Sequence, residues 1–466
     1  MSERNLDIEV KGWTFTHWWV RPVVWSWFKI YHRSFTISGM KHVEWSKPII
    51  FAPTHQSAFT DALCLILPAG YANDRFIYPL VRADVFHNSR LVDWLLTSFH
   101  MMPVYRPRDR VDLLAQNRRV FDRCRQQLEK NRNLLIHAEG NCIARKSVRP
   151  FKKGLARIAL ETLDSGNDVA DLQIIPVGIN YRNITEPRYG IHVRYGPGVN
   201  AADFMGQYAE NKSRAISRLT DTIEAGVRDL AVDIKKEDHY QLMEDVLHLA
   251  RISDERFRDH APYTQEELAL YKKTVRNFEN AVERDSTLAI SLEESLNKLK
   301  LMLKHYRLDW DLSLIPRMTT RNFVLKGLLL LLAAPAVIYG WLNNLVPWKL
   351  TQRSADPVDD EQFKSSIELV AGLLLFPVFY LIQAGFIYLL TDSWQWALAY
   401  LLSLPLSGIL SINLWEQFLC WRQQLRLRWM EKMKHRSMEK IERLTDRIWS
   451  LLNPNSGAHP VDPEKL

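Results

Sequence analysis

Cysteine is scarce in this sequence of 466 residues, and the four that occur are scattered. They are Cys64, Cys124, Cys142 and Cys420, and none of them belongs to a CxxC pair. Neither a zinc site nor a disulfide framework is therefore indicated. A chain without such pairs fits a reducing compartment, which favours a catalytic part that faces the cytoplasm.

The sequence also lacks an internal repeat, a low-complexity tract and a secretory signal at its N-terminus. Asp7, Glu9 and Lys11 precede a segment rich in Trp and Val, whereas a signal peptide has a clean apolar core. Residues 13–32 are instead predicted to form an aromatic helix that lies in the headgroup region of a membrane. The alternative is an ordinary N-terminal helix packed on the domain.

Charge is absent from three runs of 22 residues near the C-terminus. These runs are Gly327–Trp348, Leu369–Leu390 and Trp394–Trp415, and each is about as long as a helix that crosses the hydrocarbon of a bilayer. The chain as a whole has a net charge of +8, which suits a partner that carries phosphates. Sixteen Trp favour anionic lipid as that partner. A nucleic-acid partner is not expected, because no binding motif is found.

The charges that flank the apolar runs suggest how the chain crosses the membrane. Basic residues precede the first run at Arg317 and Lys326 and follow the last run from Arg422. Basic flanks prefer the cytoplasmic side, which requires an even number of crossings. We therefore predict that the first run, which contains Pro335, is interfacial or re-entrant, and that the other two form a hairpin around residues 391–393. The alternative is three buried helices of a soluble domain.

One stretch, PIIFAPTHQSAFTDAL at 48–63, carries the residues on which the functional hypothesis depends. Its apolar start predicts a buried strand, and the polar residues before Asp61 predict the start of a helix. His55 and Asp61 would point about 240° apart on one continuous helix, so they meet only if a turn lies between them. A carboxylate that binds one imidazole nitrogen leaves the other as a general base. The alternative interpretation is a loop histidine beside a helix N-cap aspartate.

Strands alternate with helices from about residue 35 to residue 202, which predicts an α/β domain. The fold class that we expect is an α/β catalytic domain, with a mixed sheet flanked by helices, followed by a helical region and C-terminal transmembrane helices. The expected parts are a membrane-interfacial helix at 1–34, the catalytic domain at 35–202, a helical region at 203–316, a membrane region at 317–418, and a basic amphipathic helix with a disordered tail at 419–466.

Four blocks in this domain stand in an order that points to one family. They read THQSAFTD, then MMPVYRP, then HAEGNC with RPFKKGLARIAL, and last IIPVGI with HVRYGPG. This order resembles the glycerol-phosphate and 1-acyl-glycerol-phosphate acyltransferase family over roughly residues 35–200. The family's motifs include His-(four residues)-Asp, a strand that ends in Arg, Pro-Glu-Gly, and a strand that contains Pro.

The resemblance implies a role for each matching residue. His55 looks like the general base, and Asp61 looks like the carboxylate that orients it. The residues that would bind substrate are Arg106 for the phosphate, Glu139 and Gly140 as the Glu-Gly pair, and the cations Arg145, Lys152 and Lys153.

Three departures from the family pattern bear on the substrate. Five residues rather than four separate His55 from Asp61, a spacing that suits the branch acylating glycerol-3-phosphate or dihydroxyacetone phosphate. Ala138 stands where the family usually has Pro. Asn141 and Cys142 replace the usual Thr/Ser-Arg, which puts one phosphate contact in doubt and leaves Arg145 as a substitute.

The resemblance implies an integral membrane enzyme of phospholipid biosynthesis, in the bacterial inner membrane. It would move a fatty acyl group from acyl-CoA or acyl-carrier protein to a glycerol-phosphate-type acceptor, without a metal or bound cofactor. The alternatives are an acyltransferase of another lysolipid and a catalytically inactive scaffold that binds lipid. A covalent route through Cys142 is not favoured, because His137 should alternate away from the site on its strand. The sequence predicts no particular oligomeric state.

Overall fold

The structure is a computed structural model that divides the chain into two compact units. The first unit contains residues up to Asp233 together with Tyr263–Leu268 and Val358–Leu369, and the second contains Ile234–Pro262, Ala269–Pro357 and the chain from Val370. The structure describes residues 15–72, 76–83, 86, 93–94, 96–97, 99–104, 113–165, 169–257, 261–308, 310, 318–432 and 436–452.

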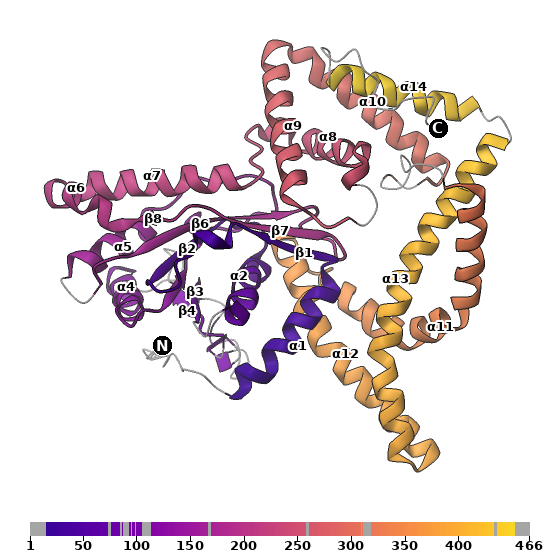
Figure 1. Cartoon of the computed structure of the whole chain (residues 1–466), viewed down its shortest axis with the longest axis horizontal. Helices are drawn as coiled ribbons and strands as arrows, with labels where there is room; N and C mark the ends of the chain where they lie inside the picture. The colour runs from indigo at the N-terminus through magenta and orange to yellow at the C-terminus, as the bar shows by residue number, and fades with distance from the viewer. Residues whose placement is uncertain are drawn as a thin grey trace. The chain divides into compact units, whose positions relative to one another are not determined.

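The first unit is built on a mixed eight-stranded sheet (Figure 1). Its strands are β1 Ser34–Ser38, β2 Ile49–Pro53, β3 Ile77–Arg82, β4 Met102–Val104, β5 Asn133–Leu135, β6 Gln173–Tyr181, β7 Gly190–Tyr195 and β8 Val199–Asn200. The order across the sheet is β1-β7-β6-β2-β5-β3-β4, with β8 also paired to β6. The strands from β6 through β2, β5 and β3 to β4 are parallel, and β7 runs antiparallel to β6. All residues of β2 and β6 are buried, as expected for strands covered on both faces.

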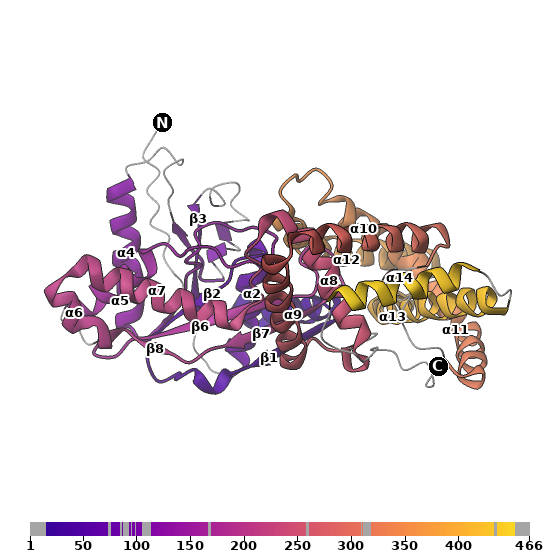
Figure 2. The ribbon, with the colours of Figure 1, turned by 90° about the horizontal axis from the view of Figure 1, so that it is seen from above.

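Helices cover both faces of this sheet. They are α1 Phe15–Tyr31, α2 Ala58–Ala72, α4 Leu113–Glu129, α5 Gly154–Asp164, α6 Met205–Glu210 and α7 Lys212–Leu230. Asn180 of β6 donates a hydrogen bond to the carbonyl of Leu230 in α7, whereas its neighbour Tyr181 donates to Asp61 in α2. Successive side chains of a strand point to opposite faces, so α7 and α2 lie on opposite faces of the sheet. Figure 2 shows α7 lying across β6.

Helix α7 packs on the sheet through the apolar face of its amphipathic sequence. Ala215, Leu219, Ile223 and Val227 recur every four residues, and all four are buried in one core with residues of α4, α5 and the sheet. The predicted boundary at residue 202 is therefore too early, since α6 and α7 continue the unit that contains the sheet as far as Asp233.

The pairing of β2 with β5 determines at which edge of the sheet the candidate site residues lie. The two strands are adjacent and parallel, with Phe51 opposite Leu135. The segments that follow the two strands therefore begin side by side. His55 lies on the segment after β2, and His137 to Gly140 lie on the segment after β5. In open α/β sheets this is the edge where ligands bind.

The second unit is helical. Its shorter helices are α8 Tyr240–Ser253, α9 Gln265–Arg284, α10 Ser286–His305 and α14 Arg436–Leu452, and the first residues of α9 count with the first unit. Helices α10 and α14 pack against each other, and Lys300 of α10 forms an ion pair with Asp245 of α8.

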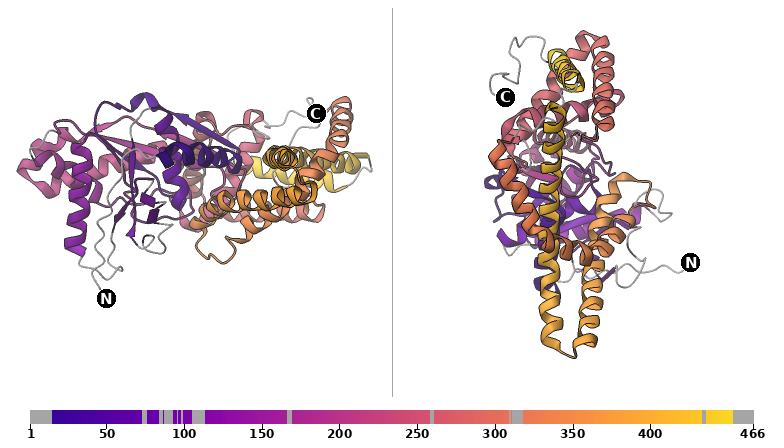
Figure 3. Two further views of the ribbon diagram at one scale, coloured as in Figure 1. Left: turned by 90° about the horizontal axis from the view of Figure 1, so that it is seen from below. Right: turned by 90° about the vertical axis from the view of Figure 1, so that its right-hand side faces the viewer.

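Three further helices have the length and composition of membrane spans. They are α11 Thr320–Arg353, α12 Glu361–Thr391 and α13 Trp394–Lys432, with 34, 31 and 39 residues. At about 1.5 Å per residue each is longer than the roughly 30 Å of bilayer hydrocarbon. No more than 17% of the apolar window of any of them is buried, so their apolar side chains face outward. The right-hand view of Figure 3 shows the hairpin in which α12 turns into α13.

Small and polar side chains hold these helices together. A Cβ on Gly340 of α11 would lie 2.3 Å from the carbonyl oxygen of Ser407 in α13, so the two backbones approach closely. Tyr400 of α13 donates hydrogen bonds to Asn343 of α11 and to Gln383 of α12. Close backbones and interhelical hydrogen bonds of this kind stabilise helix packing in lipid.

The structure confirms the predicted fold class: a mixed α/β sheet with flanking helices, a helical region and long apolar helices near the C-terminus. The predicted hairpin around residues 391–393 is present.

Two details of the membrane region differ from the prediction. Pro335 does not interrupt α11, which is one helix from Thr320 to Arg353, so no re-entrant turn forms at this proline. That the first run is interfacial stays a prediction. A proline removes one backbone donor, and a membrane helix tolerates this where neighbouring groups or local adjustments satisfy the freed carbonyl. One basic helix was expected at residues 421–451, but two helices share this range. Helix α13 continues to Lys432, and α14 begins at Arg436. The predicted disordered tail from Asn453 lies outside the described residues.

The contact between β6 and α7 leads to a testable expectation. A Cβ on Gly178 would lie 2.2 Å from the carbonyl oxygen of Leu230, so Gly178→Ala forces the helix off the sheet. We expect the free energy of unfolding to fall by about 1–3 kcal/mol, measured by denaturant titration of the purified protein in detergent. The matched control is Gly206→Ala in α6, where a Cβ meets open space and no loss is expected. Equal stability of the two variants would contradict the close approach.

Candidate active site

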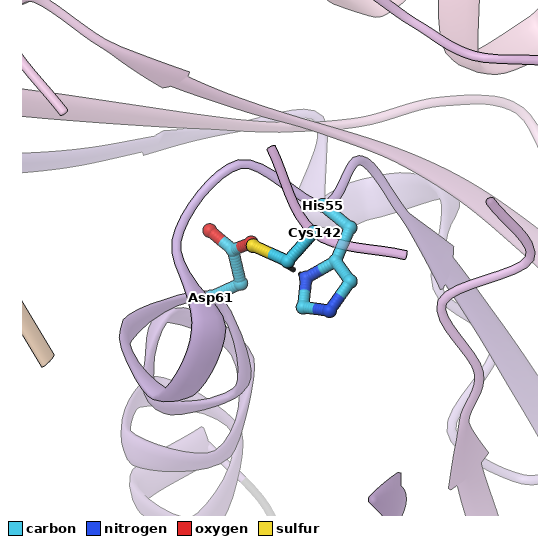
Figure 4. A group of neighbouring side chains, drawn as sticks. All are labelled: His55, Asp61 and Cys142. Carbon is cyan, nitrogen blue, oxygen red and sulfur yellow. Dashed lines mark hydrogen bonds and ion pairs between the residues drawn. The ribbon is translucent and has the colours of Figure 1, made fainter. Parts of the chain in front are cut away.

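The loop after β2 brings the two predicted catalytic residues together. Thr54 is tied to β6, because its hydroxyl donates to the carbonyl of Ile179 and accepts the Ile179 amide. The chain then turns before α2 begins at Ala58. His55 and Asp61 face each other across this turn, with 3.0 Å between Nδ1 of the imidazole and Oδ2 of the carboxylate (Figure 4).

Asp61 is a fully buried carboxylate that receives several hydrogen bonds. Its Oδ2 accepts the backbone amides of Gln56 and Ser57 at 2.8 and 2.9 Å, and its Oδ1 accepts the hydroxyl of Tyr181 at 2.6 Å. Burial raises the pKa of Asp61 to about 6, while these donors lower it. The group is therefore ionised at neutral pH, which fixes the Nδ1–H tautomer of His55 and leaves Nε2 as the basic nitrogen.

His55 is held on two further sides. Its backbone amide donates to Oε1 of Glu139 at 2.9 Å, and its ring stacks on His137 with centroids 3.8 Å apart. Burial lowers the pKa of His137 to about 3, so that ring is neutral and does not repel a charged His55. The expectation that His137 points away from the site is wrong, because β5 ends at Leu135 and strand alternation does not extend to residue 137.

Glu139 lies inside the protein and holds two segments together. It is 3% exposed, and its Oε2 accepts Nε of Arg149 at 3.1 Å while Oε1 accepts the His55 amide. Burial raises the pKa of Glu139 to about 7, and the Arg149 charge opposes this shift. Gly140 next to it has a φ of 77°, a left-handed conformation that favours glycine. Glu139 thus holds the loop that carries His55, and Gly140 shapes the loop that follows β5.

The predicted cations occupy different environments. Lys152 and Lys153 are exposed, and the Lys152 side chain runs beside Gly140. Arg145 is half-buried in the loop that follows Gly140. Arg106 lies outside the described residues.

Two arginines that the sequence analysis did not single out also lie here. Arg149 pairs with Glu139, and Arg82 ends β3 with its guanidinium 5.8 Å from the ring of Phe363. Both charges influence the thiol of Cys142. The position of Arg82 at the carboxyl end of a parallel strand could have identified it, because that end is where the other site residues gather.

Cys142 lies close to the His55–Asp61 pair. Its Sγ, a nitrogen of His55 and an oxygen of Asp61 lie within 4.8 Å of one another (Figure 4). Burial and the nearby Asp61 charge raise the pKa of the Cys142 thiol, so it stays protonated. The oxygens of Asp61 already accept four hydrogen bonds.

One family model and two known proteins match part of this chain. The family model described as Acyltransferase matches residues 34–180, the segment that contains every residue of the site described above except Phe363 and Tyr181. Glycerol-3-phosphate O-acyltransferase 1 of Saccharomyces cerevisiae is 29% identical over 116 residues, which is 24% of this chain. The chain covers only 15% of the length of that relative.

A solved structure is also similar in part. The crystal structure of the 1-acyl-sn-glycerophosphate (LPA) acyltransferase PlsC from Thermotoga maritima aligns with 45% of this chain and 78% of its own, with a TM-score of 0.32 and 15% identity. The segment at residues 34–180, which includes His55 and Asp61, therefore matches the family described as Acyltransferase and is similar in part to a glycerol-3-phosphate O-acyltransferase.

Proposed function

We propose that this protein is a membrane-bound O-acyltransferase of phospholipid biosynthesis. It moves a fatty acyl group from acyl-CoA or acyl-carrier protein to the hydroxyl of glycerol-3-phosphate or 1-acyl-glycerol-3-phosphate. The observation that carries the proposal is the His55–Asp61 pair, in which a buried carboxylate orients an imidazole whose side chain is 16% exposed. A base that is oriented from inside and open to solvent can receive the proton of a substrate.

The reaction needs one proton transfer in each direction. Nε2 of His55 takes the hydroxyl proton of the acceptor as its oxygen attacks the thioester carbonyl. When the tetrahedral intermediate collapses, the carbon–sulfur bond breaks and the leaving thiolate takes the proton from the imidazolium. Asp61 stabilises the imidazolium during this interval, as a buried carboxylate does in other histidine-based acyl transfers.

The acceptor phosphate is a suitable ligand for the cations around the site. Lys152 and Lys153 are exposed on the segment that follows the Glu-Gly pair, and Arg145 lies between them and that pair in the sequence. Arg106 is proposed from the sequence motif. Glu139 acts from inside, by holding the His55 amide and Arg149, rather than by touching the acceptor. No metal or bound cofactor is required by this chemistry.

The helices support a membrane location for the reaction. Three of them have the length of membrane spans, and α1 exposes Trp19 and Val23, which suits an interfacial helix. A lipid product can then pass directly into the bilayer. We further propose that the catalytic unit faces the cytoplasm of the bacterial inner membrane, because basic residues flank the apolar helices and cytosolic thioesters supply the acyl group.

The test of the function is the rate of acyl transfer in purified membranes. With labelled acyl-CoA or acyl-carrier protein, glycerol-3-phosphate, dihydroxyacetone phosphate, 1-acyl-glycerol-3-phosphate and another lysolipid are offered in parallel. We expect His55→Ala to lower kcat by about 100-fold or more, because the general base is lost. Asp61→Asn should also be slow, because the amide no longer fixes the active tautomer.

The matched control is His305→Ala, which removes an exposed histidine at the end of α10. It should keep the wild-type rate. If no acceptor is acylated, or if His55→Ala has the wild-type rate of acyl transfer, the chain is not an acyltransferase of this kind. The hypothesis of a lipid-binding scaffold is then favoured.

The buried carboxylate predicts a pH dependence. The active form has Asp61 ionised, and this carboxylate gains a proton as the pH falls through its raised pKa of about 6, so kcat/KM should decrease below about pH 6. Tyr181→Phe removes a donor that lowers the pKa of Asp61, so the acidic limb should move to higher pH. Rates measured from pH 5 to 9 for both proteins check this. A limb that stays in place, or moves to lower pH, contradicts the assigned role of Asp61.

The covalent alternative is tested by Cys142→Ala. The thiol is protonated and therefore a poor nucleophile, so we expect the variant to keep at least about a third of the wild-type kcat. Loss of activity comparable to His55→Ala, together with a labelled acyl group on wild-type Cys142, would instead establish a thioester intermediate.

A further inference from the structure

The first turns of α12 belong to the unit that contains the sheet, not to the unit that contains the rest of that helix. Residues Val358–Leu369 group with the catalytic sheet, whereas α12 continues to Thr391 in the second unit. The segment is therefore a direct link between a candidate membrane span and the acyltransferase domain, and its contacts within the first unit show what it holds.

Ser366 of this segment contacts the start of α2. Its Oγ accepts the backbone amide of Phe59 at 2.9 Å and that of Thr60 at 3.3 Å. The neighbouring Ser365 bonds the hydroxyl of Ser57 at 2.9 Å. Ser365 and Ser366 are 1% and 5% exposed, so these hydrogen bonds are made away from water.

The hydrogen bonds from Ser366 supply an acceptor to amides in the first turn of α2. The first amides of an α-helix have no carbonyl partner within the helix, and the side chain of the residue just before it usually accepts them. In α2 this acceptor comes from Ser366, about 300 residues further along the chain. Loss of the acceptor would leave the partly buried amide of Phe59 and the buried amide of Thr60 without this partner.

The start of α2 also positions the carboxylate of Asp61 against the imidazole of His55. Asp61 follows Thr60 directly, and its amide donates to the carbonyl of Ser57. Its carboxylate reaches back over the same turn to Gln56 and His55. A small shift of this turn therefore displaces the carboxylate from the imidazole.

The α12 segment is itself held in place by α1. Tyr31 donates to the carboxylate of Glu368 at 2.7 Å, and Nε1 of Trp27 donates to the carbonyl of Leu369 at 2.8 Å. These contacts lie one turn or less from Ser366. They fix the segment against the catalytic unit independently of the Ser366 contact.

We propose that Ser366 is a positioning residue for acyl transfer: its hydroxyl caps α2 and thereby holds Asp61 against His55. This inference rests on the proposed function. It makes α12 part of the catalytic apparatus, so that the motifs at residues 55–61 depend on a helix outside the segment matched by the family.

The experiment compares Ser366→Ala with two serine controls in the full-length protein in membranes. We expect Ser366→Ala to lower kcat about 10-fold or more while KM for the acceptor stays within about twofold, because orientation rather than substrate contact is lost. Ser365→Ala, which removes a contact to a side chain rather than to the amides, should cause a smaller loss. Ser407→Ala in α13, where the hydroxyl bonds its own helix at Leu404, should match wild type.

A double variant separates positioning from general packing. If Ser366 acts through Asp61, Ser366→Ala should slow the Asp61→Asn protein by less than about twofold. The inference is overturned if Ser366→Ala has the wild-type kcat, or if it slows the Asp61→Asn protein by the same factor as wild type. These results are distinct from failure of the proposed function, in which His55→Ala itself has the wild-type rate.

Discussion

The structure of the site depends on one buried carboxylate. Asp61 has no solvent contact, and an isolated charge in such a place is costly unless hydrogen bonds compensate for the lost water. Four donors do so: the ring of His55, the amides of Gln56 and Ser57, and the hydroxyl of Tyr181. The turn before α2, the end of β6 and the helix that caps α2 must all be in place for these donors to converge.

A second buried carboxylate, Glu139, solves a similar problem in another way. It is compensated by Arg149 and by the His55 amide, and so it joins the segments after β5 and β2. The two carboxylates therefore have different tasks. Asp61 acts on the imidazole ring, and Glu139 holds the backbone of the same histidine. Burial raises the pKa values of both carboxyl groups, and the hydrogen bonds that each accepts oppose this shift.

The membrane helices follow a different principle from the sheet. Apolar side chains cannot select partners in lipid, and α11, α12 and α13 are instead joined by small residues and by Asn343, Gln383 and Tyr400. The beginning of α12 departs from this pattern, because its two serines face the catalytic unit. One helix thus changes from a polar, protein-facing surface to an apolar one along its length, as expected for a helix that leaves a domain and enters a bilayer.

The sequence by itself determined the features that depend on short-range pattern. Apolar runs predicted the strands and the long helices, and the turn between His55 and Asp61 was evident from residues 48–63. Only the tertiary structure decided which distant groups complete the site. Tyr181 reaches Asp61 because β6 pairs with β2, His137 stacks on His55 because β5 ends early, and Ser366 caps α2 from the first turns of α12. Periodicity and turn residues act over a few positions, whereas these contacts join segments from about 80 to 300 residues apart, and packing alone selects them.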